Sequence, residues 1–259
     1  MKTNRFQPAY AALTVLMLLS LACGAIAAPT DAPTATEPPP PTETLTPVPP
    51  TETAVPTNTP RPTATLNLAA TAQVESWQED LQFFADKGFG GGSAGSFEAI
   101  DDFNEAWAQI NWYQYWPVSE TDGDFMFGAH LDWSSASSTP DVSGCGVVFG
   151  LQSNDDHYAV VVDRGRILFL MGRGSHVYEV GKTSGSGRLS YGNPAEADLL
   201  VLVVNQTAYV SVDKDVTRYT LSQDQVTSGD LALTVLSGTN RDYGTRCKMS
   251  NIHLWQPED

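Results

Sequence analysis

The stretch DFMFGAHLDW, residues Asp124–Trp133, decides the fold class. Apolar side chains occupy every second position of this stretch. Such an alternation places them on one face of a β-strand, because successive Cβ atoms point to opposite sides. The face expected to be buried carries Phe125, Phe127, Ala129, Leu131 and Trp133. The stretch therefore predicts a half-buried antiparallel strand.

The same two-residue period recurs downstream of this strand. The repeating positions are Cys145, Val147, Phe149 and Leu151, then Tyr158, Val160 and Val162, then Leu231, Leu233 and Val235. Leu199–Val204 is apolar throughout, so we expect both faces of that strand to be covered. Clusters rich in Asn, Asp, Gly and Ser separate the runs, and no helical pattern lies between them. The predicted fold class is all-β, a sandwich of two antiparallel sheets.

Five short segments between Phe97 and Trp255 carry a resemblance to a known superfamily. They are Asp101–Phe103, Asp124–Phe127, Gly144–Phe149, Asn154–Tyr158 and Ser250–Trp255. In this order they resemble the concanavalin A-like lectin/glucanase jelly roll, which includes laminin-G-like modules, as found behind Thr/Pro-rich stalks on bacterial surface lipoproteins. The resemblance implies a jelly-roll domain over residues 97–259. Such a fold does not by itself dictate a function.

Before this domain, the hydrophobic period becomes that of an amphipathic helix between Asn67 and Lys87. The apolar stripe consists of Ala70, Val74, Trp77, Leu81 and Phe84. Asn67 suits an N-cap, Gly88 ends the segment, and Gly90–Ser93 form a flexible joint, so helix and joint occupy residues 67–96. We expect the stripe to pack on the sandwich. The alternative is a coiled or partner-binding helix.

Residues 23–66 have the composition of a disordered stalk. From Pro29 to Leu66 they are nearly all Pro, Thr, Ala and Glu, which cannot bury enough apolar surface to fold. At about 3.1 Å per residue, an extended stalk would reach on the order of 100 Å. Residues 1–22 have the pattern of a signal peptide, with Lys2 and Arg5 ahead of the uncharged run Ala9–Ala22. That run is shorter than the ~20 residues of a transmembrane helix.

Two cleavage sites compete after the signal peptide. Leu19-Ser20-Leu21-Ala22-Cys23-Gly24 resembles a bacterial lipobox, although Ser20 stands where that pattern prefers Leu. This site would place a lipid on Cys23 and anchor the protein to the membrane at the cell surface. Cleavage after Ala27 would instead release a soluble, secreted protein. We favour lipidation of Cys23.

The other two cysteines, Cys145 and Cys247, are predicted to form a disulfide. An exported chain permits them to pair, and the jelly-roll resemblance suggests that they fall on neighbouring positions. The bridge would close a loop of about 100 residues, worth about 4 kcal/mol in the chain-entropy model. The alternative is two buried free thiols.

The composition and the spacing of polar residues argue against several functions. With 14 basic and 30 acidic residues the net charge is -16, which disfavours nucleic acid and anionic lipid as partners. The resemblance implies that a glycosidase would carry acidic residues at alternate positions of one strand. The nearest acidic cluster, Glu98, Asp101, Asp102 and Glu105, lacks that spacing. We therefore expect no catalytic site.

No cofactor is predicted, and calcium is considered but not favoured. Asn154-Asp155-Asp156 and Asp122-Gly123-Asp124 offer the oxygen ligands that calcium prefers, as it often has in lectin and laminin-G relatives. Asn, Asp and Gly also form turns, and neither cluster has the spacing of a calcium loop. We favour turns. The four histidines are scattered, without the spacing of a zinc site.

The candidate ligand-binding residues lie in WAQINWYQYW, residues Trp107–Trp116. If this stretch is one strand, its core-facing side carries Ala108, Ile110, Trp112 and Trp116. Its other side carries Gln109, Asn111, Tyr113 and Tyr115. The second set combines aromatic planes with amide groups, a mixture suited to stacking on sugar rings and binding their hydroxyls. The alternative is that these aromatics only pair with a neighbouring strand.

The sequence thus favours a surface-tethered, non-catalytic module that binds a glycan or another component of the cell envelope. A second hypothesis is an adhesion or assembly module that recognises protein. A third is an uncharacterised carbohydrate-active enzyme, which requires two carboxylates about 5–9.5 Å apart. No oligomeric state follows from the sequence.

Overall fold

The computed structural model describes residues 68–90, 94–138, 142–180 and 189–258. The predicted signal peptide, stalk, lipidation site Cys23 and N-cap Asn67 lie outside these residues. The described part contains helix α1 (Leu68–Asp86), followed by strands β1 to β13. No helix within it combines the length and the apolar character needed to cross a bilayer.

Seven strands form the first sheet, in the spatial order β1-β13-β4-β9-β10-β11, with β2 also paired to β13. All neighbouring strands in it run antiparallel. Their bounds are β1 (Gly95–Ala99), β2 (Phe103–Trp107), β4 (Phe125–Ser135), β9 (Ala195–Val204), β10 (Thr207–Val212), β11 (Asp215–Thr220) and β13 (Thr245–Pro257).

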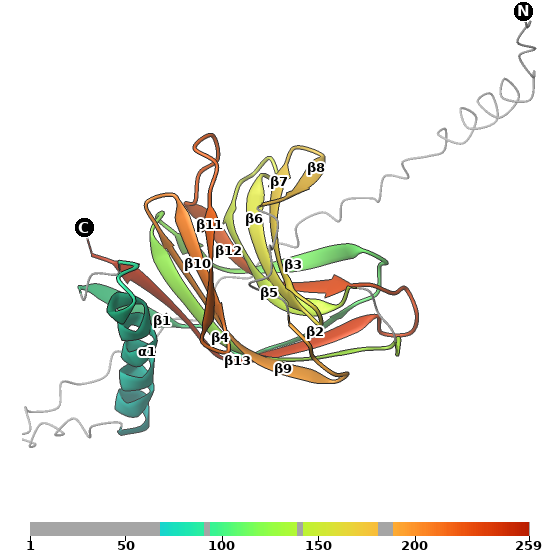
Figure 1. Ribbon diagram of the computed structural model, residues 1–259, viewed down its shortest axis with the longest axis horizontal. Coiled ribbons are helices and arrows are strands. Elements are labelled where there is room, and N and C mark those ends of the chain that lie inside the picture. The colour runs from blue at the N-terminus through green and yellow to red at the C-terminus, as the bar shows by residue number, and fades with distance from the viewer. Residues whose placement is uncertain (1–67, 91–93, 139–141, 181–188, 259) are drawn as a thin grey trace, which may run out of the picture. The chain divides into compact units, whose positions relative to one another are not determined.

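Six strands form the second sheet, in the order β3-β12-β5-β6-β7-β8, again antiparallel. Their bounds are β3 (Trp112–Thr121), β5 (Gly144–Leu151), β6 (His157–Asp163), β7 (Ile167–Arg173), β8 (His176–Glu179) and β12 (Gly229–Ser237). Figure 1 shows β10 and β11 of the first sheet across from β6 and β7 of the second. The predicted all-β, two-sheet antiparallel jelly-roll sandwich is confirmed.

The core lies between the sheets and is built by the alternating positions. Phe125, Phe127 and Leu131 of β4 are completely buried there, and β5, β6, β9 and β12 add their own alternate residues. The predicted disulfide is also present, and its alternative of two free thiols is wrong. Cys145 of β5 and Cys247 of β13, 102 residues apart, bridge the two sheets with their Cα atoms 5.9 Å apart.

The helix covers the outer face of the first sheet, meaning the face turned away from the core. Trp77, Leu81 and Phe84 of α1 are buried, and the last two cluster with Leu202 of β9 and Trp255 of β13. The C-terminal part of the stripe therefore packs on the sandwich as expected, whereas Val74 is 37% exposed. This packing also explains the apolar stretch Leu199–Val204, which has the core on one face and this cluster on the other.

The expectation of one strand through residues 107–116 is wrong. Strand β2 ends at Trp107 and β3 begins at Trp112, with a turn between them in which Asn111 takes a left-handed φ of 54°. Ile110 lies in this turn and Trp112 is the first residue of β3; both were expected in the core but are 58% and 45% exposed, whereas Tyr113 is buried. Ala108 and Trp116 were also expected to face the core. Ala108 is exposed, whereas Trp116 packs against the main core.

Candidate binding site

The outer face of the second sheet carries a buried cluster of its own. Small side chains occupy its central strands: Ala232 on β12, Val148 on β5 and Ala159 on β6. Tyr113 of edge strand β3 belongs to the same cluster and is 6% exposed. Because β12 and β5 separate β3 from β6, the tyrosine must lie across these small residues to reach β6.

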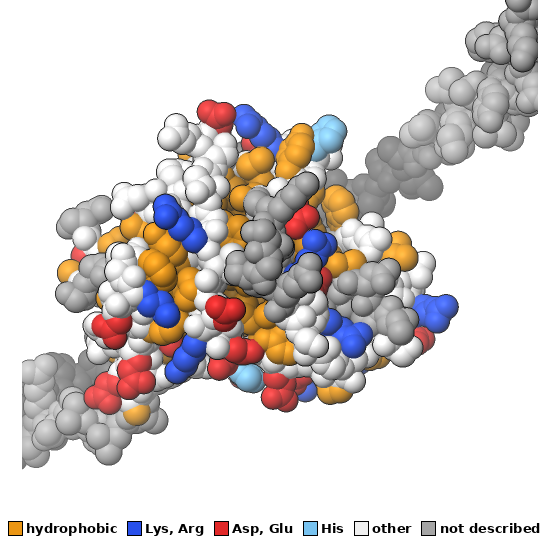
Figure 2. Space-filling model, viewed as in Figure 1, with side chains coloured by type: hydrophobic (Ala, Val, Ile, Leu, Met, Phe, Trp, Pro, Cys, Tyr) orange, Lys and Arg blue, Asp and Glu red, His pale blue; other side chains and the backbone are white. Residues whose placement is uncertain are grey.

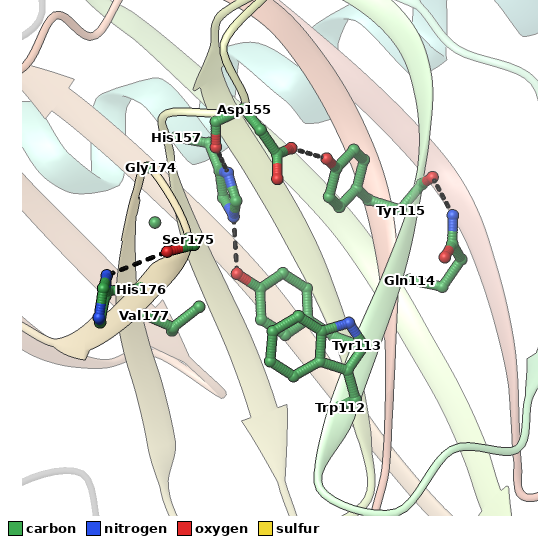
Figure 3. Close-up of a pocket in the computed structure, with 11 residues that line it drawn as sticks. Trp112, Tyr113, Gln114, Tyr115, Asp155, His157, Gly174, Ser175, His176 and Val177 are labelled. Carbon is green, nitrogen blue, oxygen red and sulfur yellow. Dashed lines mark hydrogen bonds between the residues drawn. The ribbon is translucent and has the colours of Figure 1, made fainter. Parts of the chain in front are cut away.

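Tyr113 reaches His157 at the start of β6. The tyrosine Oη and His157 Nε2 are 2.6 Å apart, and both side chains are buried. The other ring nitrogen, Nδ1, lies 2.6 Å from the carbonyl oxygen of Asp155. A carbonyl only accepts, so Nδ1 carries the proton, and in the neutral ring Nε2 accepts the hydroxyl proton of Tyr113. Figure 3 shows this chain of hydrogen bonds.

The room for the imidazole comes from Gly172 on the adjacent strand β7. A Cβ at this position would lie 2.4 Å from Cε1 of His157. Burial, together with the nearby Tyr115 and Asp155, raises the pKa of Tyr113 well above its ordinary value. The phenol therefore stays protonated at neutral pH and serves as a donor.

A second tyrosine of β3 forms a similar hydrogen bond. Tyr115 Oη donates to Oδ1 of Asp155, in the turn between β5 and β6. Burial, followed by this hydrogen bond, raises the pKa of Tyr115 to about 12. Asp155 is held in a left-handed conformation, with φ 69°, and its neighbours Asn154 and Asp156 bond to each other. Asp156 also accepts from the backbone N–H of Gly174, which ties this turn to the one between β7 and β8.

These contacts enclose a pocket of about 420 Å³, within the range of small-ligand sites. Trp112–Tyr115 line one side, Asp155 and His157 line the floor, and Gly174–Val177 line the other side (Figure 3). The ring of Trp112 lies nearly parallel to that of Tyr113, at 20° with centroids 5.8 Å apart. It remains 45% exposed, so it offers an aromatic surface to a ligand. The pocket thus lies between β3 and β8, the two edge strands of the second sheet.

The surface around the sheet edge is partly apolar. Figure 2 shows hydrophobic side chains and a histidine exposed at the end of the molecule where β7 and β8 lie. Val177, which lines the pocket from β8, is 37% exposed. Acidic and basic side chains are interspersed over the rest of this view (Figure 2).

The structure divides the four sequence-predicted ligand-binding residues into two pairs. Tyr113 and Tyr115 line the pocket, whereas Gln109 and Asn111 lie in the exposed turn before β3 and are not part of the described lining. Sequence reasoning missed further lining residues, two of them on β3 itself and the others on β6, β7, β8 and the turns before β6 and β8. They are Trp112, Gln114, Asp155, His157, Gly172, Gly174, Ser175, His176 and Val177. One of them, His157, could have been found from the two-residue alternation of its strand, which puts it on the same face as Ala159.

The two acidic clusters considered for calcium have structural roles in the turns. Asn154 bonds to Asp156, and Asp124 Oδ1 accepts the backbone N–H of Asn205 at 3.1 Å. The backbone N–H of Asp122 donates to Gln256. Within the described ranges, no three His, Cys, Asp or Glu side chains are grouped so that they could hold a metal ion.

No protein-family model and no curated protein matches the chain. Among solved structures it is similar to the carbohydrate-binding module CBM66 from Bacillus subtilis, with 10% identity, a TM-score of 0.41, and coverage of 62% of this chain and 95% of that chain. The carbohydrate recognition domain of Emp47p matches with 12% identity, a TM-score of 0.42, and 65% and 90% coverage. Alginate lyase A1-II' matches with 9% identity, a TM-score of 0.38, and 51% and 61% coverage. These structures include binding domains and an enzyme, and likenesses at these values assign neither ligand nor activity.

Proposed function

We propose that this protein is a non-catalytic module that binds a glycan in the pocket between β3 and the β7–β8 turn. The observation that carries the proposal is the exposed Trp112 ring, stacked on Tyr113 at the mouth of a pocket with polar groups inside. An aromatic plane packs against the C–H face of a sugar, and nearby oxygens and nitrogens bind its hydroxyls.

The polar residues of the pocket support binding rather than hydrolysis. Glycoside hydrolysis generally uses two carboxyl groups about 5–9.5 Å apart. Asp155 is the single carboxylate among the described lining residues, and the hydroxyl of Tyr115 already binds it. Because the pKa of Tyr113 is raised, very little of its phenolate form is present at neutral pH to act as a general base.

The proposed cellular setting comes from the N-terminal sequence. A signal peptide over residues 1–22 would export the chain, and a lipid on Cys23 would anchor it. The stalk, residues 23–66, would then hold the module away from the membrane, where envelope or extracellular glycans are within reach.

A glycan array probed with the purified protein, with and without calcium, tests the binding proposal. For an oligosaccharide that binds, Trp112→Ala should weaken the affinity about tenfold or more, because a lost aromatic stacking contact costs about 0.5–1.5 kcal/mol beyond the lost apolar area. Ile110→Ala is the matched control. Ile110 is 58% exposed in the preceding turn and outside the described lining, so its replacement should leave the affinity unchanged.

Two outcomes would contradict the proposal. One is an array on which nothing binds in either condition. The other is binding that Trp112→Ala and Ile110→Ala affect equally. A partner captured from envelope extracts that free sugars do not displace would instead favour the protein-recognition hypothesis.

A further inference from the structure

We propose that the pocket selects uncharged sugars, through their hydroxyl groups, and rejects acidic sugars such as uronates and sulfated residues. This inference rests on the proposed glycan-binding function and concerns the charge class of the ligand. It follows from where the protons lie among the polar groups of the pocket.

The Tyr113 hydroxyl gives its proton to a hydrogen bond with a group of the protein. Nδ1 of His157 donates to the carbonyl of Asp155, so Nε2 accepts the only hydroxyl proton that Tyr113 has. The oxygen of Tyr113 then has lone pairs alone to offer a ligand. It can accept a hydrogen bond and cannot donate one.

Tyr115 and Asp155 add further acceptors to the pocket. The proton of Tyr115 is directed to Oδ1 of Asp155, so the phenol oxygen again offers only lone pairs. The carboxylate itself is an acceptor with a negative charge. The hydroxyl oxygens of Tyr113 and Tyr115 and the carboxylate of Asp155 are therefore three acceptor groups in the lining of the pocket.

An acidic ligand would need hydrogen-bond donors and positive charges to balance it. None of the described lining residues is Lys or Arg. The amide nitrogen of Gln114 donates one of its two N–H groups to the carbonyl oxygen of Tyr115, and Ser175 and His176 on the opposite side bond to each other. The second N–H of Gln114, the second ring nitrogen of His176 and the indole N–H of Trp112 are the remaining side-chain nitrogen groups of the described lining, and none of them belongs to a Lys or Arg.

The ligand class follows from this polarity. A sugar hydroxyl supplies the O–H donor that each acceptor lacks. A ligand carboxylate or sulfate offers only acceptors, so at Tyr113, Tyr115 and Asp155 it would face other acceptors and a like charge, with no Lys or Arg in the described lining to balance it. The net charge of -16 adds a long-range repulsion in the same direction.

The test compares glucose oligosaccharides with glucuronate oligosaccharides of the same length and linkage, and repeats the pair with galactose and galacturonate. Binding of the full protein is measured by calorimetry at low and at physiological ionic strength. Within at least one pair, the neutral member should bind at least tenfold more tightly, and the ratio should shrink as salt screens the charge.

Asp155→Asn supplies a second measurement. Asn keeps an oxygen for Tyr115, tolerates the left-handed backbone at this position, adds N–H donors and removes the charge. The ratio of neutral to acidic affinity should fall at least threefold in this variant. Asp215→Asn, an equal charge change at an exposed position of β11 in the first sheet, should leave the ratio unchanged.

The outcomes separate the two proposals. If acidic members bind as tightly as neutral ones and Trp112→Ala weakens both, the charge selectivity is refuted while glycan binding stands. If Asp155→Asn and Asp215→Asn change the ratio equally, the selectivity does not arise in the pocket and the inference is refuted. If no glycan binds here or on the array, both proposals fail.

Discussion

Replacing Trp77 by Ala tests whether α1 is an integral part of the sandwich. The indole is 3% exposed, and its ring stacks on that of His253 at 15° with centroids 5.0 Å apart. It also lies 5.9 Å from the ring of Phe97, and its Nε1 donates to Oδ1 of Asn251 at 2.9 Å. The side chain thus fastens the middle of the helix to β1 and β13.

Loss of these contacts should lower the free energy of unfolding. Deleting a buried Trp side chain costs about 3–5 kcal/mol, through lost burial and the cavity left behind. The hydrogen bond adds little, because Asn251 is exposed and water can replace the indole as its donor. We therefore expect the free energy of unfolding to fall by about 3–4 kcal/mol, a large share of the ~5–15 kcal/mol typical of a domain.

Guanidinium denaturation followed by far-ultraviolet circular dichroism measures this loss without relying on tryptophan fluorescence. Val74→Ala is the control on the same helix, since Val74 is 37% exposed and should cost less than about 0.5 kcal/mol. If Trp77→Ala costs no more than the control, α1 does not unfold together with the sandwich. Its apolar stripe would then be available to a partner, the alternative that the sequence left open.

Replacing Cys145 and Cys247 together by Ala should lower the free energy of unfolding by about 4–5 kcal/mol, because the bridge spans 102 residues. Denaturation curves check this, and a loss below about 1 kcal/mol would show that the bridge hardly constrains the unfolded chain. Burial raises the pKa of Tyr115 and of Tyr219 to about 12, so the stability that they contribute below pH 10 should be lost as the pH rises to 12. Tyrosinate absorbance should show phenols that ionise late, fewer of them in Tyr115→Phe, and a single ionisation of all tyrosines near pH 10 would contradict the assignment.

Much of the fold follows from local patterns. The alternation in Asp124–Trp133 predicts which side chains enter the core, because the direction of each Cβ depends only on the strand's own backbone. The helical period around Trp77 predicts an apolar stripe for the same reason. The stretch Leu199–Val204 even indicated that something covers its second face, and that cover is α1.

In the aromatic stretch Trp107–Trp116, the local pattern does not predict the structure correctly. Its alternation predicted that Trp112 is buried, but a turn with a left-handed φ at Asn111 interrupts the strand just before it, and Trp112 is 45% exposed. Asn tolerates this conformation better than most residues, yet it adopts other conformations equally well. The choice depends on how β3 pairs with β12, which no short window of sequence contains.

The opening alternation therefore determined by itself that this chain forms strands with one buried face, because strand geometry is local. The pocket was decided only by the tertiary structure. Tyr113 and His157 are 44 residues apart and meet because β12 and β5 lie between their strands and carry small residues on that face. Such a meeting depends on strand order and sheet curvature, which result from packing of the whole domain and not from any residue's neighbours in sequence.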